Sequence, residues 1–273
     1  MKNSNASEKS KGVVVFAFNT SHVDYVALAD ETSKLTSRNL KLPITLITDH
    51  DSTPKFAYDK IVRVSSQSGN TRSDRGVDKE WRNFGRYMAY ELSPYDTTIL
   101  LDSDYLVLDQ SLLTLLKQDF DYRLMHNSHN YKETLYQKMG EVALPFVWAT
   151  VVLFRKTEIS RMYFDLIGRI QRNYGYYRAL YGIRDSNFRN DFAFSIANIV
   201  LNGHAVDPTI SVPWPMTTIE PDIENIEIRN GFLVVRYDVR ADVISRQNLH
   251  IMDKNYLTSD QFERLVDEVC DEG

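Results

Sequence analysis

Two carboxylates separated by one residue, Asp102 and Asp104, directly follow the apolar run at residues 98–101. Negative charge at the end of a buried strand must be solvated, paired with a cation or bound to a metal. A divalent cation suits this turn, because Mg²⁺ and Mn²⁺ commonly bind through one or two carboxylates together with the phosphates of a substrate. The two residues alone are equally compatible with a solvated acidic turn.

A second pair of residues whose side chains could take part in chemistry, His250 and Lys254, lies near the C-terminal end of the sequence. A separation of four residues places both on one side of the chain, whether the segment is extended or makes one helical turn. Taken singly, such a histidine is usually structural and such a lysine is usually a solvated surface charge. Together, an imidazole and an ammonium group could complete a metal shell and hold a phosphate oxygen.

The most basic segment of the chain, residues 169–189, interleaves arginines with tyrosines. Its members are Arg169, Arg172, Tyr174, Tyr176, Tyr177, Arg178, Tyr181, Arg184 and Arg189, against a single acidic residue, Asp185. One interpretation is an acceptor platform, since tyrosines stack on sugars or bases while arginines hold phosphate. The acceptor would then be a glycan or a modified nucleic acid. The other interpretation is a helix end with solvated arginines.

The elements that must position these side chains follow from the spacing of apolar residues. Strand-length apolar runs lie at residues 12–19, 42–48, 60–64, 98–101 and 147–155. Helical spacing is found at residues 23–37, 79–92, 158–173, 186–201 and 259–269, the first of them after a capping-box-like Ser21-x-x-Asp24. Strands that alternate with helices predict an α/β fold with a mainly parallel central sheet. Ligands bind such sheets at the carboxyl ends of strands, where the acidic turn lies.

Two connecting segments carry signals of their own. The polar, glycine-bearing residues 65–77 predict a long loop, either a lid over a site or a plain surface loop. Asn230-Gly231, between the alternating residues 226–229 and 232–236, predicts a tight β-hairpin.

Composition limits the class of protein. The chain has 273 residues, of which 43% are hydrophobic and 25% charged, which is typical of a globular protein with one large core or two lobes. We expect a polar leader at residues 1–11, one domain at 12–257 and a C-terminal helix with an acidic tail at 258–273. No apolar run approaches the about 20 residues that span a bilayer, and a cytoplasmic protein is expected.

Charge and cysteine content limit the partners. The single cysteine, Cys270, cannot form an internal disulfide, and without a His/Cys cluster any metal must be held by oxygen and imidazole. The net charge of −5 provides no general attraction to nucleic acid or anionic membranes. Such a partner would have to meet a local basic patch.

These features together resemble the GT-A glycosyltransferases of the glycogenin and lipopolysaccharide galactosyltransferase group, family 8. The similar pieces follow in order over about residues 13–256: the first strand, the basic helix with Arg86, the DxD turn, and the late histidine with lysine. The resemblance implies that Asp102, Asp104 and His250 bind Mn²⁺ or Mg²⁺ and that Lys254 contacts the diphosphate. It also implies a donor-binding set and a catalytic pair. The donor-binding set is Ala17, Phe18, Asn19, His22, Arg86, Ser103 and Asn190, and the catalytic residues are Asp191 and Lys254.

The sequence departs from this family at three places. Asn19-x-x-His22 stands where the family has an Asp-x-x-Tyr that holds the nucleobase, which leaves the base open. Trp148-Ala149-Thr150 replaces an Asn-small-Gly segment of the sugar pocket, and Phe192 replaces the glutamine after Asp191. The transferred sugar is therefore open as well.

The predicted function is a metal-dependent glycosyltransferase that moves a sugar from a nucleotide-sugar donor, with retention implied by the resemblance. A nucleotidyltransferase would need a glycine-rich phosphate loop after the first strand, and residues 18–25 contain no glycine. Two alternatives stay open. One is a haloacid-dehalogenase-like phosphatase with Asp102 as nucleophile. The other is a non-catalytic sugar- or metal-binding module.

Overall fold

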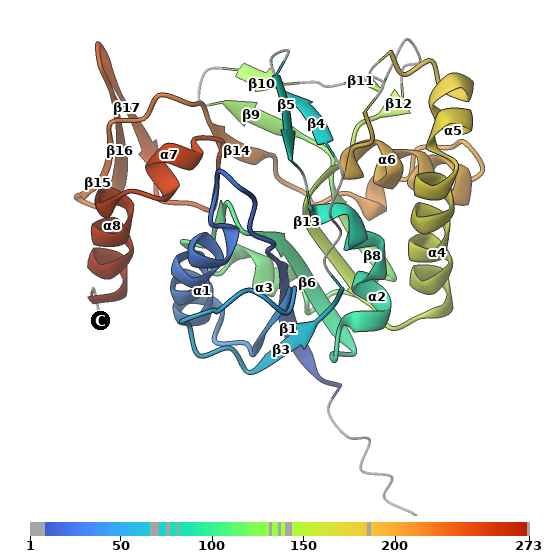
Figure 1. Ribbon diagram of the computed structural model, residues 1–273, viewed down its shortest axis with the longest axis horizontal. Helices are drawn as coiled ribbons and strands as arrows, with labels where there is room; N and C mark the ends of the chain where they lie inside the picture. Colours follow the sequence, from blue (N-terminus) through green and yellow to red (C-terminus); the bar gives the residue numbers. More distant parts are fainter. Residues whose placement is uncertain are drawn as a thin grey trace, which may run out of the picture.

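The computed structural model describes residues 9–65, 71–74, 77–80, 82–130, 133–135, 138–139, 144–184 and 187–271. Its central sheet has the order β3-β2-β1-β6-β13-β8 (Figure 1). The strands are β1 (Lys11–Phe16), β2 (Ile44–Thr48), β3 (Lys60–Arg63), β6 (Thr97–Asp102), β8 (Tyr122–Met125) and β13 (Trp148–Arg155). The first four are parallel, and β13 runs antiparallel to both β6 and β8. The predicted α/β class with a mainly parallel sheet flanked by helices is confirmed.

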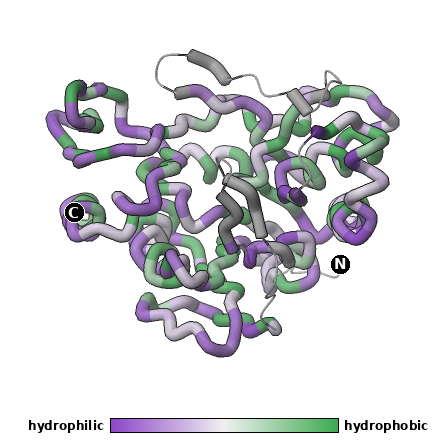
Figure 2. Tube along the Cα trace, turned by 45° about the horizontal axis from the view of Figure 1, so that its top comes forward, coloured by the Kyte–Doolittle hydropathy of each residue, from purple (hydrophilic) through white to green (hydrophobic). Residues whose placement is uncertain are grey.

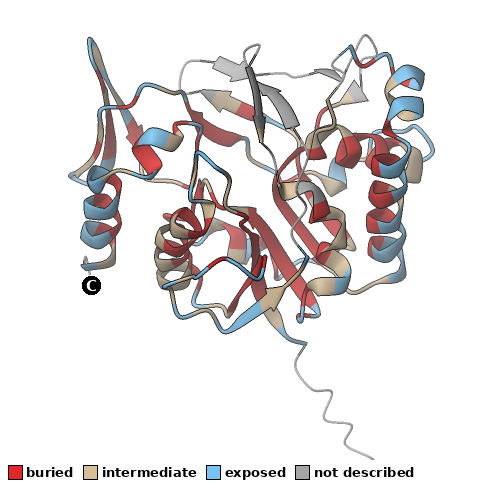
Figure 3. Cartoon of the chain, viewed as in Figure 1, coloured by how far each residue is buried: buried red, intermediate tan, exposed pale blue. Residues whose placement is uncertain are grey.

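Helices cover both faces of this sheet, because successive strand residues point to opposite sides. In β1, Val13 and Val15 face a core shared with α1 (Tyr25–Leu40) and α3 (Ser111–Leu115). Val14 and Phe16 face a second core. That core is shared with α2 (Ala89–Leu92), α4 (Glu158–Arg172) and α6 (Asn190–Leu201). Figure 3 shows these strands as buried, which explains why their sequences are continuous apolar runs rather than alternating ones.

A second sheet, with the order β10-β9-β14-β18-β7, adjoins the carboxyl edge of the first. Its strands are β7 (Tyr105–Leu106), β9 (Ser128–Asn130), β10 (Glu133–Leu135), β14 (Met216–Ile219) and β18 (Leu249–Ile251). Strand β7 follows β6 after only a two-residue turn. The acidic turn is therefore the junction of the two sheets.

The C-terminal part forms a third core. The strands β15 (Asn225–Arg229), β16 (Phe232–Tyr237) and β17 (Arg240–Ser245) form an antiparallel sheet against α8 (Asp260–Asp271). Figure 2 shows hydrophobic and hydrophilic residues mixed along α8, as an amphipathic helix requires. Asn230 and Gly231 have φ of 53° and 78°, the left-handed pair of a type I′ turn, which confirms the predicted hairpin.

The smaller elements complete the chain. They are β4 (Thr71–Asp74), β5 (Val77–Glu80), the 3₁₀ helix η1 (Asn83–Met88), β11 (Lys138–Met139), β12 (Leu144–Pro145), α5 (Tyr174–Leu180), the 3₁₀ helix η2 (Pro208–Ile210) and α7 (Lys254–Leu257).

Three local predictions were wrong. The helix expected at residues 79–92 begins only at Asn83 and is 3₁₀ before it becomes α2, because Gly85 lowers the helix propensity of its first turn. The loop expected at 65–77 contains β4, which pairs with β5 as a hairpin; residues 66–70 and 75–76 lie outside the described residues. Asp24, not Ser21, caps α1, and its carboxylate accepts from the Ala27 N–H at 2.9 Å.

Candidate active site

The site begins where the chain changes direction within the central sheet. From β1 the chain continues to β2 and β3 on one side, whereas β6 lies on the other side of β1. The carboxyl ends of β1 and β6 are level, since Phe16 pairs with Asp102. Such a switch point separates the connecting loops and leaves room for a ligand at the strand ends.

Strand pairing in the second sheet brings His250 to the acidic turn. Strand β18 pairs with β7, with His250 opposite Tyr105, and the Ile251 N–H donates to the backbone oxygen of Asp104 at 3.0 Å. Lys254 follows as the first residue of α7, whose N-cap is Asp253. The predicted proximity of His250 and Lys254 to the turn is present in the structure.

Asp104 is the electrostatic centre of this group. Lys254 Nζ donates to Asp104 Oδ2, and His250 Nε2 lies 3.7 Å from the same oxygen. Burial alone would raise the pKa of Asp104, but Lys254 and His250 outweigh it and hold that pKa well below its ordinary value. The other oxygen, Oδ1, is buried and has no hydrogen-bond partner among the described residues. A buried carboxylate oxygen without a hydrogen-bond partner is costly, and a bound cation is one way to compensate its charge.

Hydroxyl groups behind His250 fix its orientation. His250 Nδ1 lies 3.4 Å from Thr218 Oγ1 on β14, which lies 2.8 Å from Ser128 Oγ on β9. Both hydroxyl-bearing residues are buried. The contact at Nδ1 directs Nε2 toward Asp104, as a partner behind a metal-binding histidine does. Sequence patterns did not identify Thr218 or Ser128, because single hydroxyl residues in short strands carry no spacing signal.

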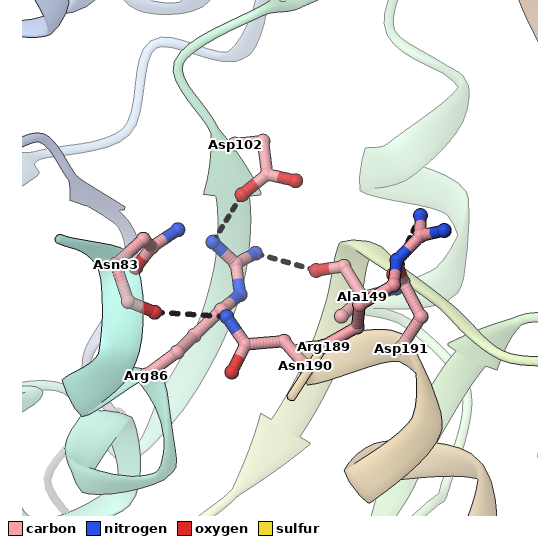
Figure 4. A pocket seen from close by; sticks show the side chains of 7 residues that line it. All are labelled: Asn83, Arg86, Asp102, Ala149, Arg189, Asn190 and Asp191. Carbon is pink, nitrogen blue, oxygen red and sulfur yellow. Dashed lines mark hydrogen bonds and ion pairs between the residues drawn. The ribbon is translucent and has the colours of Figure 1, made fainter. Parts of the chain in front are cut away.

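Arg86 anchors the other carboxylate of the turn. Its side chain is 1% exposed, pairs with Asp102 through Nη1, and donates through Nη2 to the Ala149 carbonyl at 2.5 Å (Figure 4). Burial raises the pKa of Asp102, with Arg86 opposing the rise and Asp104 and Asp191 adding to it. Arg86 thus compensates the negative charge of Asp102 from inside the protein, because Arg86 itself is buried. The Asp102 side chain remains 27% exposed.

The first turn of α6 forms the opposite wall. Asp191 Oδ1 accepts from the Ala149 N–H at 3.1 Å, and Oδ2 pairs with Arg189 at 3.1 Å. Asn190 Nδ2 donates to the Asn83 carbonyl at 2.9 Å. The resulting pocket is lined by Asn83, Arg86, Asp102, Ala149, Arg189, Asn190 and Asp191 (Figure 4).

Three residues that line the pocket each have a polar side-chain atom without a hydrogen-bond partner among the described residues. Asn83 Oδ1, Arg86 Nε and Arg189 Nε are buried and make no hydrogen bond within the described chain. No sequence pattern marks Asn83 as a site residue. Arg189 is predicted only as part of the basic segment, although its position directly before Asn190-Asp191 could have indicated a role in the site.

The remaining predicted donor residues lie at the end of β1 and in the turn. The side chains of Ala17 and Phe18 are buried in the two cores. Ser103 is buried within the acidic turn. Asn19 is partly buried, and His22 is exposed.

The basic segment divides into two parts. Tyr174 and Tyr181 are buried, and Tyr181 Oη hydrogen-bonds His204 Nε2 at 3.1 Å, so both have structural roles. Tyr176 is 67% exposed and packs edge-on against Tyr177 with ring centres 5.4 Å apart. Only this second pair offers aromatic surface to a partner. Asp185 lies outside the described residues.

The predicted three-residue metal shell is only partly assembled. Among the described residues, no group of three or more His, Cys, Asp and Glu side chains is arranged to hold a metal. Asp104 and His250 lie together, while Asp102 is directed to Arg86. No helix in the part of the chain that the structure describes is long and apolar enough to cross a membrane.

Comparisons with known proteins return structural likenesses. Neither a family model nor a curated protein matches the sequence. The apo form of the glycosyltransferase GlyE from Streptococcus pneumoniae TIGR4 aligns at 16% identity and TM-score 0.40, over 74% of this chain and 45% of that one. A second GlyE structure gives 16%, 0.40, 70% and 43% in the same order. This chain thus spans less than half the length of GlyE.

The galactosyltransferase LgtC, in complex with donor and acceptor sugar analogs, aligns at 16% identity and TM-score 0.45, over 68% of this chain and 70% of that one. Because these identities and scores are low, functional inference rests on the residues of the site. The chain is structurally similar, at distant sequence identity, to the glycosyltransferases GlyE and LgtC.

Proposed function

We propose that the protein is a glycosyltransferase that uses a nucleotide-sugar donor and a divalent metal. The observation that carries this proposal is the buried Asp104 carboxylate, which lies beside His250 and Lys254 at the switch point of the sheet. One of its oxygens has no hydrogen-bond partner among the described residues. A polar pocket adjoins it, between Asp102 and Asp191. The two parts match the diphosphate and the sugar of one donor.

The residues fit a hard divalent cation. Asp104 Oδ1 is a carboxylate oxygen without a partner among the described residues, and carboxylate oxygens are ligands that Mn²⁺ and Mg²⁺ prefer. Asp104, His250 and Asp102 would hold it, the last after its carboxylate turns from Arg86. When bound, the metal would act as a Lewis acid that neutralises charge on the diphosphate leaving group.

Lys254 supplies a further cation for the leaving group. In the structure its ammonium group neutralises Asp104. We infer that Lys254 exchanges this carboxylate for a phosphate oxygen when the donor binds, so that the positive charge is already in place as the anomeric bond breaks. Lys254 remains 25% exposed, which leaves it accessible to that oxygen.

Asp191 and Arg86 hold the sugar end of the pocket. Both oxygens of Asp191 are engaged, by the Ala149 N–H and by Arg189, so its carboxylate is fixed at the pocket wall. There it can orient a sugar hydroxyl or stabilise positive charge on the anomeric carbon. A reaction with retention needs no general base, so Asp191 would not have to accept a proton from the acceptor. Arg86 and Asn190 complete the polar lining.

The acceptor site proposed for the basic segment is reduced to the exposed Tyr176 and the partly buried Tyr177 that packs against it. Stacking on a sugar ring or a base is the chemistry this pair offers. A glycan or a modified nucleic acid remains the proposed acceptor class.

The pocket favours a transferase over the alternatives. A phosphatase with Asp102 as nucleophile gives no role to the polar pocket between Asp102 and Asp191, whereas the sugar of a nucleotide-sugar donor would occupy it. A non-catalytic binding module does not explain why Lys254 lies beside Asp104, a carboxylate that could bind a metal.

The proposal is tested by screening nucleotide-sugars for Mn²⁺-dependent thermal stabilisation and for slow donor hydrolysis. We expect at least one donor to stabilise the wild type only with metal, and Asp104→Asn to lose the effect. Asp267→Asn on the exposed face of α8 is the matched control. Equal stabilisation of wild type and Asp104→Asn, or none by any donor, would reject the proposal.

A further inference from the structure

The outer face of α4 carries apolar side chains that the described part of the chain leaves exposed. Ile159 and Met162 are each 47% exposed. Leu166, one turn further along, is only partly buried against the core beneath the helix. On α5, Tyr176 is 67% exposed. Figure 3 shows exposed residues along the outer side of both helices, at one edge of the molecule. Folding of a single chain therefore leaves apolar surface on this face, and such surface favours association.

These side chains repeat with the spacing of a helix-packing seam. The seam consists of six residues at separations of three and four in turn, Ile159, Met162, Leu166, Arg169, Asn173 and Tyr176. Such spacing keeps side chains on one narrow stripe of a helix, as in paired helices. Only Asn173 separates α4 from α5, and helical hydrogen bonds continue across it. The Asn173 N–H donates to the Arg169 carbonyl at 3.2 Å, and the Tyr177 N–H donates to the Asn173 carbonyl at 3.3 Å. Figure 1 shows α5 stacked on the end of α4, so the stripe passes from one helix to the other.

Charge is distributed unequally along the seam. Glu158 and Asp165 flank its first half, and Arg161 between them pairs with both, at 2.5 and 2.8 Å. The second half carries Arg169 and Arg172, and residues 166–184 contain no acidic residue. Two copies laid antiparallel would place the acidic half of each seam against the basic half of the other, whereas parallel copies would oppose like charges. The seam is therefore complementary to itself in the antiparallel direction.

We propose that two copies of this chain pair through this seam, with α4 and α5 antiparallel to the same helices of the partner about a two-fold axis. Ile159 then packs against Tyr176 of the partner subunit, and Asp165 lies beside the partner's Arg172. In a two-fold contact each of these interactions occurs twice. The polar members of the seam lower its affinity while fixing its register. The inference does not rest on the proposed function, and the partner subunit and an acceptor would compete for Tyr176.

Sedimentation equilibrium of the full chain, over about 1 to 200 μM, measures the association. We expect a wild-type dimer with a Kd of about 1 to 100 μM, because the seam is partly polar. Ile159→Glu places a carboxylate in the apolar part of each seam and should weaken dimerisation at least about tenfold. Val239→Glu is the matched control, since Val239 is 90% exposed in the β16–β17 turn and the change in charge is the same. This control should leave dimerisation unchanged.

An exchange of charges tests the antiparallel register. Asp165→Arg and Arg172→Asp each set like charges against each other across the contact, and each should weaken dimerisation about tenfold. The double variant restores opposite charges and should return to within about threefold of the wild type. Within one chain these residues lie about 10 Å apart along the helix axis, too far for a direct pair, so the rescue reports the contact between copies. Both positions are exposed, and urea unfolding verifies that each variant keeps its fold.

Four results would overturn the inference. They are a wild type that stays monomeric at about 200 μM, equal dimerisation of the wild type and Ile159→Glu, a double charge variant that dimerises no more tightly than the single variants, and equal weakening by Val239→Glu. The last result would show that net charge, not the seam, controls association. None of these results bears on nucleotide-sugar binding, so the inference and the proposed function fail independently.

Discussion

Arg86→Met removes the guanidinium that pairs with Asp102 inside the protein. Arg86 is 1% exposed, and its Nη2 also satisfies the Ala149 carbonyl at 2.5 Å. Methionine approximates the volume of the arginine stem, so the change deletes charge and hydrogen bonds with little loss of packing. Asp102 and the carbonyl are then left without their partner.

The expected loss of stability follows from these contacts. Breaking a buried ion pair by removing one partner costs about 3 to 5 kcal/mol. The Asp102 side chain is 27% exposed, so water reduces this term and the lower end applies. The unpaired carbonyl adds about 1 kcal/mol. We expect about 3 to 4 kcal/mol in all, which lowers the melting temperature by roughly 10 °C in a chain of this size.

Urea unfolding followed by circular dichroism measures the effect, with Asp102→Asn and the double variant completing the cycle. If the cost arises from an uncompensated carboxylate, the double variant should recover about 2 kcal/mol relative to the sum of the single changes. A loss below about 0.5 kcal/mol in Arg86→Met, or strict additivity, would refute the account of Arg86 as the internal counter-charge of Asp102.

Two further predictions concern histidines. Thr218→Val removes the hydroxyl behind His250 and should weaken Mn²⁺ binding about tenfold, measured as free Mn²⁺ by electron paramagnetic resonance; unchanged affinity would show that the hydroxyl does not orient the ring. Burial lowers the pKa of His126 from 6.5 to about 4. Between these two pH values the unfolded chain therefore binds a proton at His126, whereas the folded chain does not. Stability should be unaffected by this group above pH 6.5 and should fall by about 3 kcal/mol between pH 6.5 and 4. His126→Gln should flatten that part of the urea-unfolding profile, and an equally steep profile in the variant would contradict the assignment.

Long periodic segments could be predicted from the sequence because burial on both faces demands uninterrupted apolar residues. Strands β1, β2, β6 and β13 and helices α1, α4 and α8 lie within a few residues of their predicted positions. The segment before Arg86 could not be predicted, because its aromatic spacing imitates a helix while Gly85 and the β4–β5 pairing favour other local structure.

The candidate site was predictable where chemistry marks a residue type and unpredictable where pairing decides a role. Asp104, His250 and Lys254 were identified from type and spacing, and strand pairing brings them together. The attachment of Asp102 to Arg86 depends on a tertiary contact that spacing does not show. The same holds for Asn19, whose side-chain oxygen accepts a hydrogen bond from the Val26 N–H in the first turn of α1.

The most direct test of the central claim is calorimetric binding of a nucleoside diphosphate with Mn²⁺ and with EDTA, in wild type and Asp104→Asn. If Asp104 and His250 hold the metal that bridges to the diphosphate, the metal should tighten binding to the wild type by at least about tenfold, and Asp104→Asn should lose that gain. Equal affinity in EDTA and Mn²⁺, or a full metal effect in Asp104→Asn, would contradict a metal–diphosphate site at the Asp102–Asp104 turn.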